Sequence, residues 1–254
     1  MSGLSPEEEQ ILQTLQAKKA AANPPSNKLV HVIQVLDKSG SMNTGREITI
    51  SAFNENLDIM ERQASVARTT ATLITFSDSS RVNVEYQEAS PDRAIRLNTT
   101  NYVPDGYTAL YDAIGRALEL ARSFEGASTN AQFLLQVVTD GAENHSKRYT
   151  AQTLKSLISE LQATDRWTVT VMGPKGQIDL FADRLGLMRG NTVQFDASSV
   201  RSRGFAKSAL NASTQNYFTQ TAAGSTSMSD AYASVVQGGD VDNLAKQKPD
   251  QAQP

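Results

Sequence analysis

The feature that most constrains the fold is a run of eight residues, 29–36 (LVHVIQVL), that is mostly apolar and dense in β-branched side chains. A strand with so few polar positions fits a sheet that is covered on both faces. Strand-like runs recur at 70–76, 133–138, 167–172 and 192–195. Helical apolar spacing occurs at 47–62 and 109–124, and further helices are expected at 150–161, 178–187 and 202–223. This alternation predicts an α/β fold with a doubly wound, mostly parallel sheet and right-handed crossovers.

One predicted strand differs from the others. Residues 81–86 (RVNVEY) alternate strictly between polar and apolar side chains, and a short polar turn separates them from the strand at 70–76. Strict alternation after a turn is typical of an antiparallel strand with one solvated face. We therefore expect a single antiparallel strand at one edge of the sheet.

Composition divides the chain into three parts. With 254 residues and 39% hydrophobic content, the chain is long enough for one substantial core. For residues 1–27, the sequence predicts an N-terminal arm with a short helix, which either packs on its own domain or binds a partner. For residues 28–223, the sequence predicts the α/β domain, including a C-terminal helix. Residues 224–254 are rich in Ser, Gly, Asp, Lys, Gln and Pro, which predicts a polar, flexible tail.

Charge and composition exclude several classes of function. The 24 basic and 27 acidic side chains give a net charge of −3, so no global attraction to nucleic acid or to an anionic membrane is expected. The absence of cysteine excludes disulfides, thiol nucleophiles and zinc–thiolate sites. The first thirty residues lack a signal peptide pattern and no long apolar run follows, which predicts a soluble, cytoplasmic protein.

The loop after the first strand is rich in oxygen ligands. In the sequence DKSGS, Asp37, Ser39 and Ser41 offer one carboxylate and two hydroxyls at alternate positions. Alternate side chains of an extended segment point the same way, so the three are placed to face one ion. Hard cations such as Mg²⁺ prefer oxygen ligands. The same residue types also form ordinary turns, so the loop alone leaves both interpretations open.

A second carboxylate occupies an equivalent place in the chain. Asp140 follows the strand at 133–138, just as Asp37 follows the strand at 29–36. In open α/β sheets ligands bind outside the carboxyl ends of the strands. Both aspartates are therefore expected at the same edge of the sheet.

Three segments together carry a resemblance to a known family. Residues 37–41 (DKSGS), 106–113 (GYTALYDA) and 137–141 (VVTDG) resemble, in order and context, the three-loop signature of von Willebrand factor A domains, and the similarity extends over roughly 29–198. The resemblance implies a Rossmann-like fold and a metal-ion-dependent adhesion site. The metal ligands that it implies are Asp37, Ser39 and Ser41 from the first loop, Thr108 from the second and Asp140 from the third. The implied ion is Mg²⁺, although Mn²⁺ and Ca²⁺ also accept oxygen ligands.

Other residues near these loops have two interpretations each. Asp112, one helical turn after Thr108, either orients the metal ligands or is an exposed or capping carboxylate. A further set lies around the mouth of the predicted site and either selects the partner or is simply solvated. This set comprises Lys38, Asn144, His145, Lys147 and Arg148.

The favoured function is a non-enzymatic, Mg²⁺-dependent adhesion or adaptor module. In that function the metal accepts a carboxylate from an acidic side chain of another protein, as the resemblance implies. The missing secretion signal and the loop at 140–146 look more like intracellular bacterial or phage-type members of the family than like secreted receptors, and a phage-encoded member implies association with the virion.

Two alternatives remain open. The first is a Mg²⁺-dependent phosphoryl-transfer or hydrolytic enzyme that uses Asp37 as nucleophile, although Ser39 stands where a second acid is commonly needed. Motifs of a nucleophile elbow or a phosphate-binding loop do not occur in the sequence. The second alternative is a structural component of a phage particle or another assembly.

Overall fold

The computed structural model describes residues 28–125, 130–233, 235–236 and 241, so the predicted arm at 1–27 lies outside the described residues. Six strands form one sheet: β1 (Leu29–Asp37), β2 (Arg68–Phe76), β3 (Val82–Ala89), β4 (Ala131–Val138), β5 (Trp167–Pro174) and β6 (Thr192–Phe195). The helices are α2 (Arg46–Arg62), α3 (Leu110–Glu125), α4 (Ala151–Gln162), α5 (Ile178–Leu185) and α6 (Val200–Ala222), with short 3₁₀ turns η1 (Gly40–Gly45) and η2 (Arg189–Asn191). Each predicted strand and helix of the domain is present, with ends shifted by a few residues.

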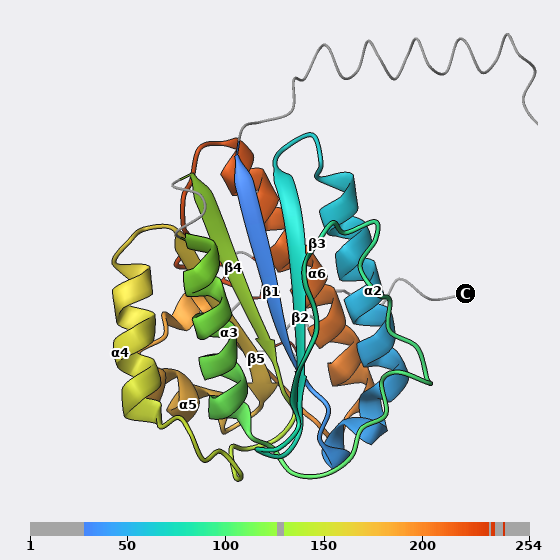
Figure 1. The fold of residues 1–254 in the computed structure, drawn as a ribbon. Helices are drawn as coiled ribbons and strands as arrows, with labels where there is room; N and C mark the ends of the chain where they lie inside the picture. The colour runs from blue at the N-terminus through green and yellow to red at the C-terminus, as the bar shows by residue number, and fades with distance from the viewer. Residues whose placement is uncertain (1–27, 126–129, 234, 237–240, 242–254) are drawn as a thin grey trace, which may run out of the picture.

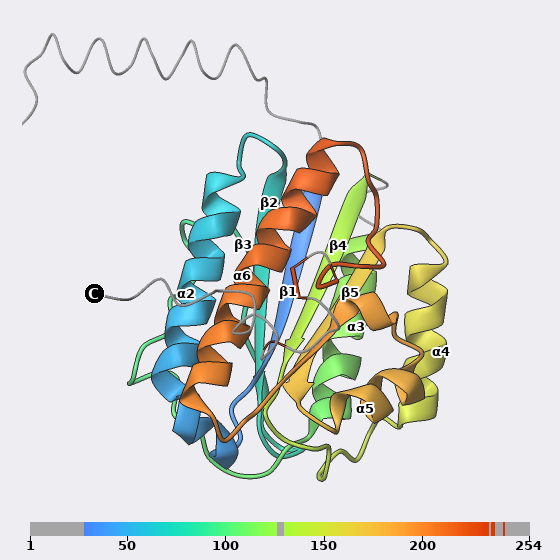
Figure 2. The same ribbon diagram turned by 180° about the vertical axis from the view of Figure 1, so that it is seen from behind.

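The sheet has the strand order β3-β2-β1-β4-β5-β6. The pair β2–β3 is antiparallel and every other pair is parallel. Helices α3, α4 and α5 cover one face, and α2 and α6 cover the other (Figures 1 and 2). This arrangement confirms the predicted α/β fold with a mostly parallel sheet and one antiparallel edge strand.

The central strand β1 explains the apolar run in the sequence. Its side chains point alternately to the two faces, and all nine residues are buried. Ile33 and Val35 belong to the core under α3, α4 and α5, whereas Val30 and Val32 belong to the core under α2 and α6. Burial of each such side chain is worth about 1.5–3 kcal/mol, so the strand needs apolar residues at nearly every position.

His31 is a core residue of the same strand. Its ring stacks between Phe124 of α3 and Phe133 of β4, at centroid distances of 5.3 and 5.2 Å. Its Nδ1 atom lies 2.6 Å from the hydroxyl of Thr70. Burial, with a smaller contribution from the charge of Arg68, lowers the pKa of His31 to about 4, so the ring is neutral at pH 7.

The predicted boundary at Gly224 falls too early. Beyond it, Met228, Ala231, Tyr232, Val236 and Val241 are buried. The last three pack against β5, β6 and α6, and the amide of Val241 donates to the carbonyl of Gln194 in β6. The described part of the predicted tail therefore belongs to the domain. Composition did not indicate this because these apolar residues occur singly among polar ones.

Among the helices of the described residues, none is long and apolar enough to span a membrane.

Candidate metal centre

The candidate site lies where the sheet changes its direction of winding. The chain leaves β1 towards β2 on one side, and β4 pairs with β1 on the other. Asp37 is the last residue of β1, and Asp140 follows the end of β4 by two residues. Such a switch point leaves a crevice outside the carboxyl ends of the strands, where open α/β sheets bind ligands.

Asp37 is fully buried at the base of the site. Its Oδ1 atom accepts a hydrogen bond from the amide of Ser39 at 2.7 Å, and its Oδ2 atom accepts one from the hydroxyl of Thr139 at 2.6 Å. Tyr102 donates its hydroxyl to the Asp37 carbonyl at 2.5 Å. Burial raises the pKa of Asp37 to about 6, and the hydrogen bonds only partly oppose this rise. A cation at the carboxylate would reverse that effect.

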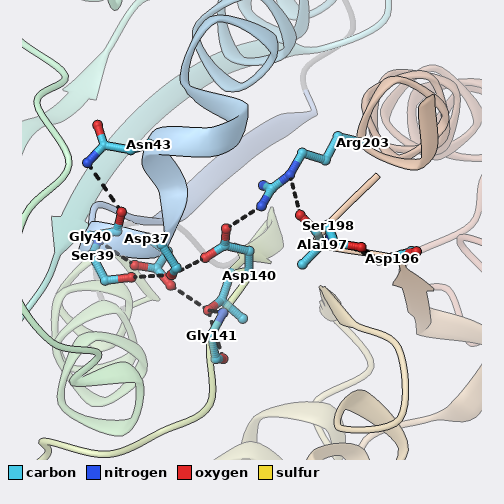
Figure 3. Close-up of polar contacts among 12 residues, drawn as sticks. Asp37, Ser39, Gly40, Asn43, Asp140, Gly141, Asp196, Ala197, Ser198 and Arg203 are labelled. Carbon is cyan, nitrogen blue, oxygen red and sulfur yellow. Dashed lines mark hydrogen bonds and ion pairs between the residues drawn. The ribbon is translucent and has the colours of Figure 1, made fainter. Parts of the chain in front are cut away.

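The two serine hydroxyls of the first loop lie together beside Asp140. Ser39 Oγ and Ser41 Oγ are 3.2 Å apart, and the Ser41 hydroxyl donates to Asp140 Oδ1 at 2.5 Å. Figure 3 shows Asp37, Ser39 and Asp140 grouped around one point. Adjacent ligands of an octahedral ion with metal–oxygen distances of about 2.1 Å lie about 3 Å apart. The 3.2 Å between the two serine hydroxyls is therefore compatible with adjacent ligand positions around one Mg²⁺ ion.

Thr108 completes the group from the second loop. Its amide donates to Asn144 Oδ1 at 3.0 Å, and its carbonyl accepts from the Asn144 amide at 3.0 Å. A Cβ atom placed on Gly141 would lie 3.0 Å from Thr108 Oγ1 and 3.7 Å from Ser41 Oγ. The hydroxyls of Thr108 and Ser41 thus both lie against Gly141, and the fold brings the five residues predicted as ligands to one place.

Arg203 of α6 is a member of the site that sequence reasoning missed. Its Nη2 atom contacts Asp140 Oδ2 at 2.7 Å, and its Nε atom donates to the carbonyl of Ala197 at 2.8 Å (Figure 3). The Arg203 and Asp140 side chains are 6% and 0% exposed. Gly45 permits this approach, because a Cβ atom there would lie 2.7 Å from the Arg203 side chain. No local pattern in the sequence links residues 63 positions apart.

Asp112 has a structural role at this site. It is buried, so the interpretation as an exposed carboxylate is wrong. Its carboxylate accepts hydrogen bonds from the amides of Lys147, Arg148 and Tyr149 at 2.8–2.9 Å. Asp112 therefore caps the backbone that follows the third loop. Glu143 has a similar role, since it accepts from the amides of Tyr111, His145 and Ser146.

The residues predicted at the mouth of the site are largely engaged within the fold. Lys38 donates its Nζ to the carbonyl of Asn101 at 2.9 Å, and Asn144 holds Thr108. His145 Nδ1 accepts from the amide of Ser79, and its ring stacks on Tyr107 at 4.9 Å. Lys147 and Arg148 are exposed. Tyr107 is also exposed and lies at the rim, although the sequence did not single it out.

The donor set fits a hard divalent cation. Among the described residues, no group of three or more His, Cys, Asp or Glu side chains is placed to hold a metal, so any ion here depends on hydroxyl oxygens. Serine and threonine hydroxyls with aspartate oxygens are ligands of Mg²⁺, Mn²⁺ or Ca²⁺ and not of soft metals. Two carboxylates and one guanidinium leave a net charge of −1 at the centre.

Fold and site together define an α/β domain that brings side-chain oxygens from three loops together at the carboxyl edge of its sheet. The protein-family model for the von Willebrand factor type A domain matches residues 31–182, so the chain belongs to this family. A comparison with curated protein sequences finds no significant match.

Solved structures of low sequence identity share the fold. Proximal thread matrix protein 1 from the mussel byssus aligns with a TM-score of 0.53 and 17% identity, over 73% of this chain and 47% of that chain. The pilus adhesin SpaC from Lactobacillus rhamnosus GG aligns with a TM-score of 0.53 and 13% identity, over 78% of this chain and 31% of that chain. This chain thus spans less than half of either protein.

Proposed function

We propose that the protein is a Mg²⁺-dependent protein-binding module that captures an acidic side chain of a partner. The observation that carries the proposal is the convergence of three loops on one point at the carboxyl edge of the sheet, where Asp37 and Asp140 are buried and Ser41 is exposed. Asp37, Ser39, Ser41, Thr108 and Asp140 would hold the ion there. Mn²⁺ or Ca²⁺ would be held by the same oxygens.

Charge explains why the partner group is a carboxylate. The centre has a net charge of −1 from Asp37, Asp140 and Arg203, and a divalent ion changes this to +1. Mg²⁺ also retains exchangeable water ligands when proteins bind it. A carboxylate from outside would replace one such ligand and neutralise the centre, whereas a neutral or cationic group would not.

The structural neighbours support a binding role by analogy. One is named as a pilus adhesin and the other as a thread matrix protein. At 13–17% identity the likeness extends to the fold alone. The proposal therefore depends on the site and not on these names.

Calorimetry of Mg²⁺ binding tests the first half of the proposal. Mg²⁺ at a hundred times its dissociation constant should stabilise the wild type by about 2.7 kcal/mol. Asp37→Asn should neither bind Mg²⁺ nor be stabilised by it, whereas Asp58→Asn, a change in an exposed ion pair with Arg96, should behave as the wild type. Equal Mg²⁺ binding by all three proteins would contradict the assignment of the ligands.

Partner capture tests the second half. Proteins retained from a native lysate in Mg²⁺ should elute with EDTA, and Asp37→Asn should retain none of them. The two alternative functions make different predictions for the same samples. A hydrolytic enzyme would turn over a phosphomonoester, and this activity would be absent in Asp37→Asn. A structural component would co-purify in a stable particle that EDTA does not dissolve.

A further inference from the structure

A groove of about 370 Å³ adjoins the candidate metal centre. It lies between the start of α3, the third loop, the end of β5 and helix α5, and Figure 1 shows α5 beside the start of α3 at the loop edge of the sheet. Its apolar lining includes Tyr111, Ala142, Pro174, Ile178, Leu180 and Phe181.

Two residues connect the groove to the metal centre. Thr139 lines the groove and donates its hydroxyl to Asp37 at 2.6 Å. Gly141 also lines it, and the hydroxyls of Thr108 and Ser41 lie directly against Gly141. A peptide bound at the metal is therefore within a residue or two of the groove, because an extended chain advances about 3.3 Å per residue.

The groove exposes apolar surface that the fold itself does not use. Helix α5 buries Ile178, Ala182 and Leu185 against the domain, whereas Leu180 is 61% exposed. Phe181 is partly exposed and stacks on Tyr111 at a centroid distance of 6.0 Å. An apolar side chain placed in the groove would bury this surface, which is the main source of favourable free energy in such contacts.

The charges at the groove favour the same kind of partner as the metal centre. Arg184 lines the groove, is exposed, and forms no ion pair with any residue of the described chain. Glu143 also lines it, but its carboxylate already accepts hydrogen bonds from the amides of Tyr111, His145 and Ser146. The unpaired charge is thus positive, which complements an acidic partner segment.

We propose that this groove is a specificity pocket for an aromatic or large aliphatic side chain that neighbours the metal-binding carboxylate of the partner. The inference rests on the proposed function, since the carboxylate at the metal sets the position of the segment. The occupant is an extended segment of another protein in which an acidic residue lies within about two positions of an apolar one.

Selection from a displayed library of linear peptides tests the inference. Each peptide carries one fixed central aspartate with random flanks, and binders held by the full chain in Mg²⁺ are eluted with EDTA. Wild type should enrich Phe, Tyr, Trp, Leu or Ile at one position next to the aspartate or one residue beyond. Leu180→Asn should recover EDTA-eluted peptides without that enrichment.

Affinity measurements with one recovered, fluorescein-labelled peptide sharpen the test. Leu180→Asn should bind it about tenfold more weakly while it binds Mg²⁺ as the wild type does. Ile95→Asn is the matched control, because Ile95 is 55% exposed and lies outside the groove, and its affinity should equal that of the wild type. Equal melting temperatures would show that both variants are folded.

The outcomes separate the inference from the proposed function. EDTA-eluted peptides with no apolar preference, or with the same preference in Leu180→Asn, would overturn the pocket and leave the metal bridge standing. A selection that yields no EDTA-eluted peptide would contradict both.

Discussion

Arg203 determines how much negative charge the candidate metal centre holds. It is the basic side chain in contact with Asp140, and both groups are removed from water. Removing one partner of a buried ion pair commonly costs about 3–5 kcal/mol, because the other charge is left uncompensated in a medium of low dielectric constant. Loss of Arg203 would therefore leave the charge of Asp140, a proposed metal ligand, uncompensated.

We predict that Arg203→Met lowers the free energy of unfolding by about 3–5 kcal/mol in EDTA, and by less in saturating Mg²⁺. The ion would compensate the charge on Asp140 that the guanidinium compensates in the wild type. Urea unfolding in the two buffers measures both values. Arg201→Met is the control, since Arg201 is exposed and lies over the Phe205 ring at 5.5 Å. A loss that is equal in EDTA and Mg²⁺ would argue against a cation at Asp140.

The lowered pKa of His31 predicts a specific dependence of stability on pH. Its pKa is about 4 in the fold, below the value of about 6.5 expected in the unfolded chain. The unfolded state therefore binds more protons between these values, and the stability due to neutral His31 is complete above about pH 6.5 and lost as the pH falls towards 4. His31→Leu should show a shallower loss over this window. The difference between the two proteins isolates His31, since the carboxyl groups titrate in both, and parallel curves would refute the assignment.

At the scale of single elements, replacing either of two helical glycines with alanine should change the stability of the protein, in opposite directions at the two positions. Gly204 in α6 has nothing within 4 Å of an added Cβ atom, so Gly204→Ala should stabilise the protein by about 0.5–1 kcal/mol. An added Cβ atom at Gly115 in α3 would lie 2.4 Å from the Tyr149 ring, so Gly115→Ala should destabilise it. Thermal melting of the two variants compares them directly, and shifts of the same sign would contradict the packing at Tyr149.

The elements of the domain were predictable because their patterns are local. Apolar residues spaced three and four apart marked α2 and α3, and nearly continuous apolar runs marked β1 and β4. The placement of Asp37 and Asp140 at one edge followed from these strands being parallel. The role of Arg203 was not predictable, because α6 buries polar Ser213 and Thr214 as well as apolar residues and no single face marks its buried side.

At the scale of the whole molecule, the domain extends past the helix that was expected to end it. A chain that ends at Gly224 lacks Tyr232, Val236 and Val241, which are buried against β5, β6 and α6. We predict that this truncation lowers the free energy of unfolding by several kcal/mol, at about 1.5–3 kcal/mol for each large apolar side chain lost. A chain that ends after Asp242 keeps these residues and is the control. Equal urea midpoints for both chains would show that the segment contributes no stability.

The orientation of β1 determines how a pull between its two ends would be carried. Leu29 and Asp37 stand at opposite ends of β1, eight steps of about 3.3 Å apart, or roughly 26 Å. A partner held at the Asp37 edge and chain attached before Leu29 would pull along this strand, which is paired on both sides with β2 and β4. Because both points belong to one strand that is already extended, the force would pass along the covalent backbone of β1 and not across the hydrogen bonds of the two ladders. A pull between these two points would therefore leave the pairing of β1 with β2 and β4 unloaded.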